Sequence, residues 1–121
     1  IITVKGLEGG VDLSISRSTT IGLYRNQVGI RKVFHPKDYE CSGKDLKWSN
    51  IQDWQRFAKQ ALNGEGPLIK ALEWNAGIYF YFSGLSTDIE HGIKKVKKII
   101  HSRLALKQLE KLINWREKKS Y

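Results

Sequence analysis

The sequence predicts an α+β fold in which a curved, mainly antiparallel sheet of six to seven short strands is packed by two helices, the C-terminal one long. In the first half, apolar residues alternate with polar ones, as in half-buried strands. Two later segments instead repeat apolar residues at helical spacing. A length of 121 residues suits one domain. We therefore expect a single domain, with the sheet and first helix in residues 1–85 and a basic helix in residues 86–121.

Seven short segments have strand character, and polar or glycine-containing turns separate most of them. Val11, Leu13 and Ile15 alternate with Asp12 and Ser14, which places the three apolar side chains on one face of a strand. The last two segments are expected to pair as a hairpin. The expected strands span residues 1–5, 11–15, 19–24, 28–34, 44–48, 68–74 and 77–82.

The first helix is expected to follow Ser49, because apolar residues from Ile51 to Leu62 fall at helical spacing. Ser49 is the expected N-cap, because Gln52 follows it at the spacing of a capping box. The Asn63-Gly64 pair is expected to end the helix, since glycine adopts a left-handed conformation at little cost.

A second capping-box spacing, between Thr87 and Glu90, is expected to begin the long C-terminal helix. Its apolar stripe runs from Ile89 to Leu104 and then shifts register. The shift allows a kink, or a second apolar face that contacts a partner.

The charge is large and uneven. Lys and Arg number 21 and Asp and Glu 12, for a net charge of +9, and residues 91–121 alone carry +8. Such a field attracts polyanions, nucleic acid before an anionic membrane or an acidic protein surface. The composition excludes collagen, a coiled-coil rod and low-complexity disorder, and no apolar run approaches the roughly 18 residues of a membrane span. No membrane association is therefore expected.

The side chains that could serve in catalysis or metal binding are scattered along the sequence. His35, His91 and His101 have no ligand-like spacing with one another or with Cys41, and the Gly6–Gly10 stretch lacks the Gly-Lys-Ser/Thr of a phosphate loop. We therefore expect no enzyme activity, no metal and no cofactor. A lone cysteine favours a reducing compartment, so the expected location is intracellular, in cytoplasm or nucleus; because the chain begins at Ile1, an organelle stays open.

Basic and aromatic side chains are interleaved along several of the expected strands. On a sheet face, rings stack on exposed bases while cations neutralise phosphates, a combination that suits single-stranded nucleic acid. Lysines of the C-terminal helix would add to the electrostatic attraction. The predicted binding residues are Arg25, Arg31, Lys32, Phe34, Lys44, Lys47, Trp48, Lys94, Lys97 and Lys98.

The stretch Val28–Phe34, the loop to Gly43, and the segments Lys44–Ser49 and Asn50–Phe57 resemble the PC4-like transcriptional coactivators, a family of single-stranded-DNA-binding proteins related to the Whirly and PUR folds. The resemblance covers roughly residues 20–62. It implies that Arg31 is the DNA-contacting arginine, that Phe34 is the strand aromatic and that Lys44 opens the last strand. It also implies a structural role for Trp54 and a homodimer formed through helices.

The leading functional prediction is thus sequence-tolerant binding of single-stranded nucleic acid, DNA rather than RNA, in transcription or genome maintenance. Two alternatives stay open. The chain could be an interaction or dimerisation module whose C-terminal helix docks on a partner, or a duplex DNA binder that places its basic helix in a groove.

Overall fold

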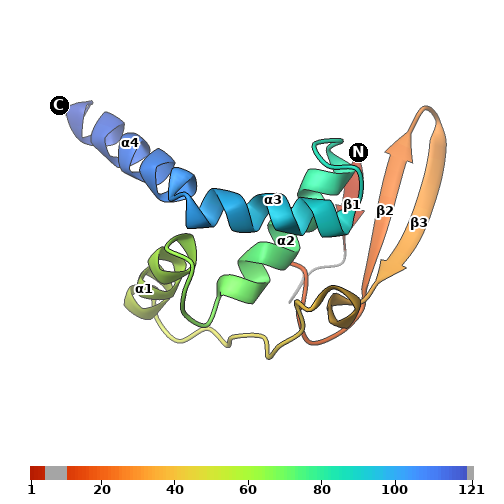
Figure 1. Cartoon of the computed structure of the whole chain (residues 1–121), viewed down its shortest axis with the longest axis horizontal. Coiled ribbons are helices and arrows are strands. Elements are labelled where there is room, and N and C mark those ends of the chain that lie inside the picture. The colour runs from red at the N-terminus through yellow and green to blue at the C-terminus, as the bar shows by residue number, and fades with distance from the viewer. Residues whose placement is uncertain (5–10, 120–121) are drawn as a thin grey trace.

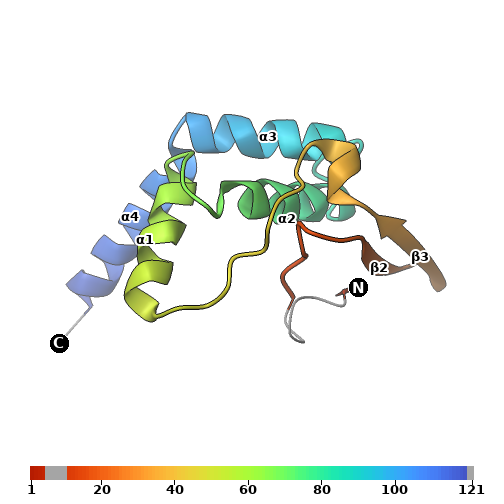
Figure 2. The same ribbon diagram turned by 90° about the horizontal axis from the view of Figure 1, so that it is seen from below.

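The computed structural model describes residues 1–4 and 11–119, and of Arg25 only the backbone. A small sheet lies at one end of the molecule (Figures 1 and 2). Helices α2 and α3 pack against each other in the middle, and α1 and α4 lie at the other end. The elements are β1 (Ile2–Val4), β2 (Thr19–Arg25), β3 (Val28–Phe34), the 3-10 helix η2 (Pro36–Tyr39), α1 (Ile51–Leu62), α2 (Ile69–Phe82), α3 (Ile89–His101) and α4 (Leu104–Lys118).

The sheet is antiparallel, with the strand order β1-β2-β3. A two-residue turn joins β2 to β3, and both of its residues, Asn26 and Gln27, have positive φ angles of 51° and 63°. Two positive φ angles in succession match the right-handed twist of a hairpin. The tight connection predicted at residues 25–27 is therefore confirmed.

One face of the sheet packs on the helices and forms the core. Ile21 of β2 is fully buried, and Leu23 and Phe34 pack against the same cluster. The helices contribute Trp74 and Ile78, both with no exposed surface. These side chains, with others of α2 and α3, fix the sheet against α2.

Helices α2 and α3 approach each other closely because each has a glycine at the crossing. A Cβ atom on Gly77 would lie 2.4 Å from Ile93 Cγ1 and 3.0 Å from the Ile93 backbone nitrogen. A Cβ atom on Gly92 would lie 2.3 Å from the carbonyl oxygen of Gly77. No other residue type fits at this separation.

The predicted number of strands is wrong: the described part of the chain has three strands and four α-helices, although the α+β class is compatible with the structure. Residues 68–74 and 77–82, predicted as a hairpin, form the single helix α2. This helix is covered on several sides and is apolar around its circumference, so it shows no helical period, and its Ile, Tyr and Phe residues mimic strand composition.

Residues 11–15 and 44–48 are also not strands. Both run as irregular segments beside the helices, and side chains rather than a neighbouring strand bind the backbone of the first one. The glycine-rich stretch 6–10 lies outside the described residues.

The helix ends match the predictions in part. Helix α1 ends at Leu62, where predicted, and Gly64 follows it with a positive φ of 86°, as expected. The N-caps lie one residue later than predicted: Asn50 Oδ1 accepts from Asp53 N at 2.8 Å, and Asp88 Oδ1 accepts from His91 N at 2.8 Å.

The predicted long C-terminal helix is two helices. Arg103 has a φ of 58°, which ends α3 and begins α4 in a new direction (Figure 1). The register shift after Leu104 therefore marks a break, one of the two predicted options. No residue of α4 is buried. The homodimer through helices stays a prediction.

None of the helices in the described ranges is long and apolar enough to cross a membrane.

Candidate functional site

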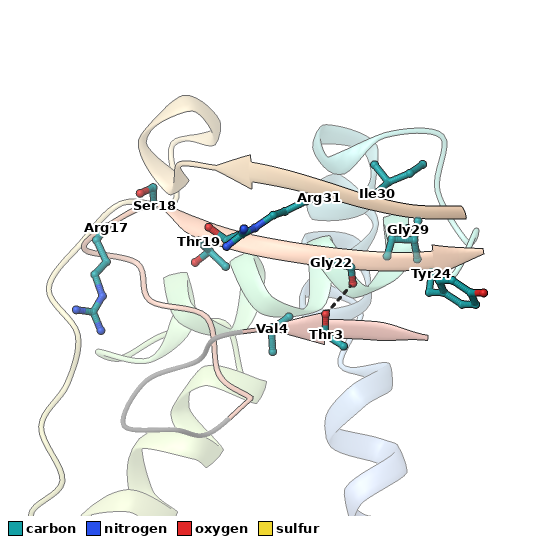
Figure 3. A pocket seen from close by; sticks show the side chains of 12 residues that line it. Thr3, Val4, Arg17, Ser18, Thr19, Gly22, Tyr24, Gly29, Ile30 and Arg31 are labelled. Atoms are coloured by element: carbon teal, nitrogen blue, oxygen red, sulfur yellow. Dashed lines mark hydrogen bonds between the residues drawn. The ribbon is translucent and has the colours of Figure 1, made fainter. Parts of the chain in front are cut away.

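A pocket of about 890 Å³ lies on the face of the sheet opposite the core (Figure 3). Residues of all three strands line it, together with the segment that leads into β2. Its polar side chains are Thr3, Arg17, Ser18, Thr19, Thr20, Tyr24 and Arg31.

The pairing of the three strands determines which residues form the floor of the pocket. Thr3 pairs with Gly22, and Gly22 pairs with Arg31, so the three residues form a row across the sheet on one face. Thr3 Oγ1 donates to Gly22 O at 3.4 Å. A Cβ atom on Gly22 would lie 2.4 Å from Thr3 Oγ1, so only glycine leaves the middle of the floor open.

The pocket is cationic. Among its described lining residues there are two arginines and no Asp or Glu. Arg31 extends across the floor toward Thr19, whereas Arg17 stands at the rim and points away from Arg31 (Figure 3). Guanidinium and hydroxyl groups together bind phosphate or carboxylate. Among the described residues of this lining there is no His, Cys or Lys.

The segment that precedes Arg17 is held at several backbone atoms by side chains from elsewhere. Asn75 on α2 accepts from Leu13 N at 2.7 Å and donates to Leu13 O at 3.0 Å. Tyr79 donates its hydroxyl to Val11 O at 2.8 Å. These bonds replace the ladder that a strand would have provided.

Asp45 holds the next three residues. Its carboxylate accepts from Ser14 Oγ at 2.6 Å, Ser16 Oγ at 2.6 Å and Ile15 N at 2.9 Å. Burial raises the pKa of Asp45, but the hydrogen bonds and the charge of Arg17 outweigh burial and hold it below its ordinary value. Asp45 and Asn75 therefore fix the position at which Arg17 enters the pocket.

This carboxylate makes the stability of the protein depend on acid pH. Because the pKa of Asp45 is lower in the folded state, its contribution is present above the unfolded value, near 3.8, and is lost as the pH falls through the folded value. In Asp45→Asn we expect about 1–2 kcal/mol lower stability at pH 7 and a shallower loss below about pH 4. Urea unfolding at several pH values measures both; parallel pH curves for the two proteins would contradict the assignment.

A second pocket, of about 350 Å³, lies between α1, α2 and the irregular segments. Its lining is mostly apolar and includes Leu46, Trp54 and Leu72, with Asp12 and Lys44 among the few charged side chains. It suits an apolar group.

The structure scatters the predicted binding residues that lie on the sheet. Arg31 lines the sheet-face pocket, but Lys32, the next residue, belongs to the opposite face. Phe34 is half-buried, with its ring 5.9 Å from that of Phe82 in the core. The side chain of Arg25 lies outside the described residues.

The remaining predicted residues lie on other elements. Lys44, Lys47 and Trp48 are exposed on the irregular segment before α1, where Trp48 lies 5.7 Å from Trp54. Lys94, Lys97 and Lys98 lie on α3. Since β3 and α1 are at opposite ends of the molecule (Figures 1 and 2), the expected face of rings and cations is not formed.

Several site residues were missed by sequence reasoning, chiefly Arg17, Thr3, Thr20, Asp45 and Asn75. The available signal was the run Ser16–Thr20, in which four hydroxyl residues surround one arginine. Asn75 gives no such signal, because it lies between the expected strands 68–74 and 77–82, where the sequence predicts the turn of a hairpin.

Other reactive groups are separate from this site. Cys41 is buried, and burial raises the pKa of its thiol, so the thiol stays protonated and unreactive at neutral pH. Across residues 1–4 and 11–119 there is no group of three or more His, Cys, Asp or Glu side chains that could hold a metal ion.

Comparison with known proteins gives one recurring name. The chain is 32% identical over 120 residues to the anthranilate phosphoribosyltransferase of Methanobrevibacter smithii, covering 94% of this chain and 35% of the relative. It is 25% identical over 118 residues to the anthranilate phosphoribosyltransferase of Acetivibrio thermocellus (94% and 34%) and 27% over 117 residues to that of Leptothrix cholodnii (93% and 34%). The chain thus spans about a third of these relatives. No family model matches the sequence.

These relatives overturn three predictions. The resemblance to PC4-like coactivators is wrong, because nearly the whole chain matches proteins of another name. The predictions of nucleic-acid binding in transcription and of a protein without enzyme activity are wrong for the same reason, since the matched relatives are transferases. Short strand motifs with arginine and aromatic residues recur in unrelated folds, and a basic net charge attracts anions of any kind, so it does not specify nucleic acid.

Proposed function

We propose that this chain is part of an anthranilate phosphoribosyltransferase. The observation that carries the proposal is the 32% identity to the Methanobrevibacter smithii enzyme, which extends over 94% of the chain rather than over one motif. The same name recurs among relatives from several other organisms.

The charge of the chain supports this proposal. A phosphoribosyl group carries a phosphate, and anthranilate carries a carboxylate, so both parts of the reaction are anionic. The chain has a net charge of +9, and the sheet-face pocket presents arginine and hydroxyl groups without a lining carboxylate. Such a pocket attracts and orients small anions.

The experiment that tests this proposal uses a chimera, because the chain matches only part of each relative. Because the chain covers 35% of the Methanobrevibacter smithii enzyme, we would exchange the matching residues of that enzyme for this chain. The chimera would be incubated with anthranilate and ribose 5-phosphate activated at C1 by diphosphate, and the adduct measured by mass spectrometry.

We expect the chimera to form the phosphoribosyl adduct of anthranilate. The unmodified relative provides the reference rate, and circular dichroism shows whether the chimera is folded. A folded chimera that makes no adduct would contradict the proposal, because the exchanged third would then lack what the reaction needs.

A further inference from the structure

We propose that the sheet-face pocket is a binding site for a phosphate group, with Arg31 as its principal ligand. The phosphate can come from free phosphate or from a sugar phosphate. The choice of ribose 5-phosphate as a probe rests on the proposed function, whereas the phosphate site itself rests on the geometry of the pocket.

Arg31, at one end of the row Thr3–Gly22–Arg31, provides the principal donors. Arg31 lies on β3, its side chain is exposed, and it crosses the floor of the pocket (Figure 3). Thr20 brings a hydroxyl group to the same lining, whereas the Thr3 hydroxyl donates to Gly22 O. A guanidinium fork with neighbouring hydroxyls matches the several acceptor oxygens of a phosphate group.

The pocket keeps space for such a group. Gly22 and Gly29 are the residues of β2 and β3 that carry no side chain into it, and the nearest atom to a Cβ on Gly29 is 4.0 Å away. Backbone without side chains permits close approach by a ligand.

The other cationic region of the molecule is less suited to an anion. Two of the four lysines on α3 lie beside acidic partners: Lys94 Nζ is 2.9 Å from Glu90 Oε1, and Lys97 Nζ is 3.8 Å from Glu73 Oε2. Lys95 donates to the carbonyl oxygen of Leu85. Within residues 1–4 and 11–119, Arg31 forms no ion pair, so no carboxylate of these residues competes with a ligand for its charge.

The second arginine, Arg17, lies at the rim of the pocket and not on its floor. It points away from Arg31, and its positive charge lowers the pKa of Asp45, so Arg17 interacts electrostatically with that carboxylate. We therefore assign the main contact to Arg31 and a weaker electrostatic contribution to Arg17.

Isothermal titration calorimetry of the full chain at low ionic strength tests the site with three probes: ribose 5-phosphate, inorganic phosphate and ribose. We expect both phosphates to bind and ribose not to bind. The ratio of the two phosphate affinities identifies the source: tighter binding of ribose 5-phosphate indicates a sugar phosphate, and equal binding indicates the phosphate group alone.

Variants locate the binding. Arg31→Gln should weaken phosphate binding about tenfold, the size of a lost charge-assisted hydrogen bond. Lys107→Gln, which removes the same charge from exposed α4 at the far end of the molecule, should change affinity less than about twofold. Circular dichroism confirms that both variants fold.

Two results would overturn the site: no binding of either phosphate, or equal losses in the two variants. They are distinguishable from a failure of the proposed function. Arg31-dependent binding with an inactive chimera would contradict only the enzyme activity, and an active chimera without this binding would contradict only the site.

Discussion

Replacing Gly92 by Ala is expected to lower the free energy of unfolding by about 2–3 kcal/mol. The added Cβ atom would lie 2.3 Å from the carbonyl oxygen of Gly77, a backbone atom that cannot move without displacing α2. Separating α2 from α3 would loosen the packing around Ile93 and Ile78 in the core. Urea unfolding followed by circular dichroism at 222 nm, a wavelength dominated by helices, measures the loss (about 1–3 kcal/mol per M is the usual slope).

The sign of this effect is informative, because helix propensity alone predicts the opposite. Alanine favours a helix over glycine by about 1 kcal/mol. Gly29→Ala on β3 is the control for the added Cβ atom alone, since a Cβ atom there meets nothing closer than 4.0 Å. A Gly92→Ala protein as stable as the original would show that α2 and α3 do not cross as closely as described.

The sequence predicts correctly those elements whose local residue pattern agrees with the way they pack in the folded protein. Helix α1 has one apolar face and a glycine that follows its last turn, so its period and its end are both visible. The β2–β3 hairpin has a two-residue turn between strands of ordinary composition. In each case the local signal and the packed structure agree.

Helix α2 could not be predicted in this way. It runs through the centre of the molecule, so both Trp74 and Ile78 are fully buried and apolar residues occupy most of its circumference. A helix that is apolar on all sides has no amphipathic period, and aromatic residues favour the strand interpretation. Length was the remaining signal: residues 68–82 can be read as one mainly apolar segment of helical length, interrupted by Lys70, Glu73 and Asn75.

The candidate site was largely hidden for a different reason. Arg31 was identified, but its partners Thr3 and Gly22 lie on two other strands and meet it only through the register of the sheet. The bonds from Asp45 and Asn75 join residues that are about 30 and 62 positions apart. Such contacts depend on the tertiary fold, which no local period encodes.

Replacing Trp74 by Ala is expected to cost about 3–5 kcal/mol, the loss typical of a large buried aromatic side chain. Trp74 has no exposed surface, and its ring lies 5.5 Å from that of Tyr39, so it connects α2 to η2 across the core. The cavity left by alanine would be lined by apolar groups of several elements, which cannot all move inward. Urea unfolding at neutral pH measures the change.

Trp74→Phe should cost far less, about 1 kcal/mol, for a reason specific to this site. The indole Nε1 is buried and has no hydrogen-bond partner in the described part of the chain, so phenylalanine loses some packing but also removes an unsatisfied donor. Trp115→Ala on α4 is the surface control, because Trp115 is 56% exposed, and it should change stability by about 0.5 kcal/mol or less. If Trp74→Phe destabilised the protein as much as Trp74→Ala, the indole Nε1 would have a hydrogen-bond partner in solution. That result would contradict the description of Nε1 as a buried donor without a partner.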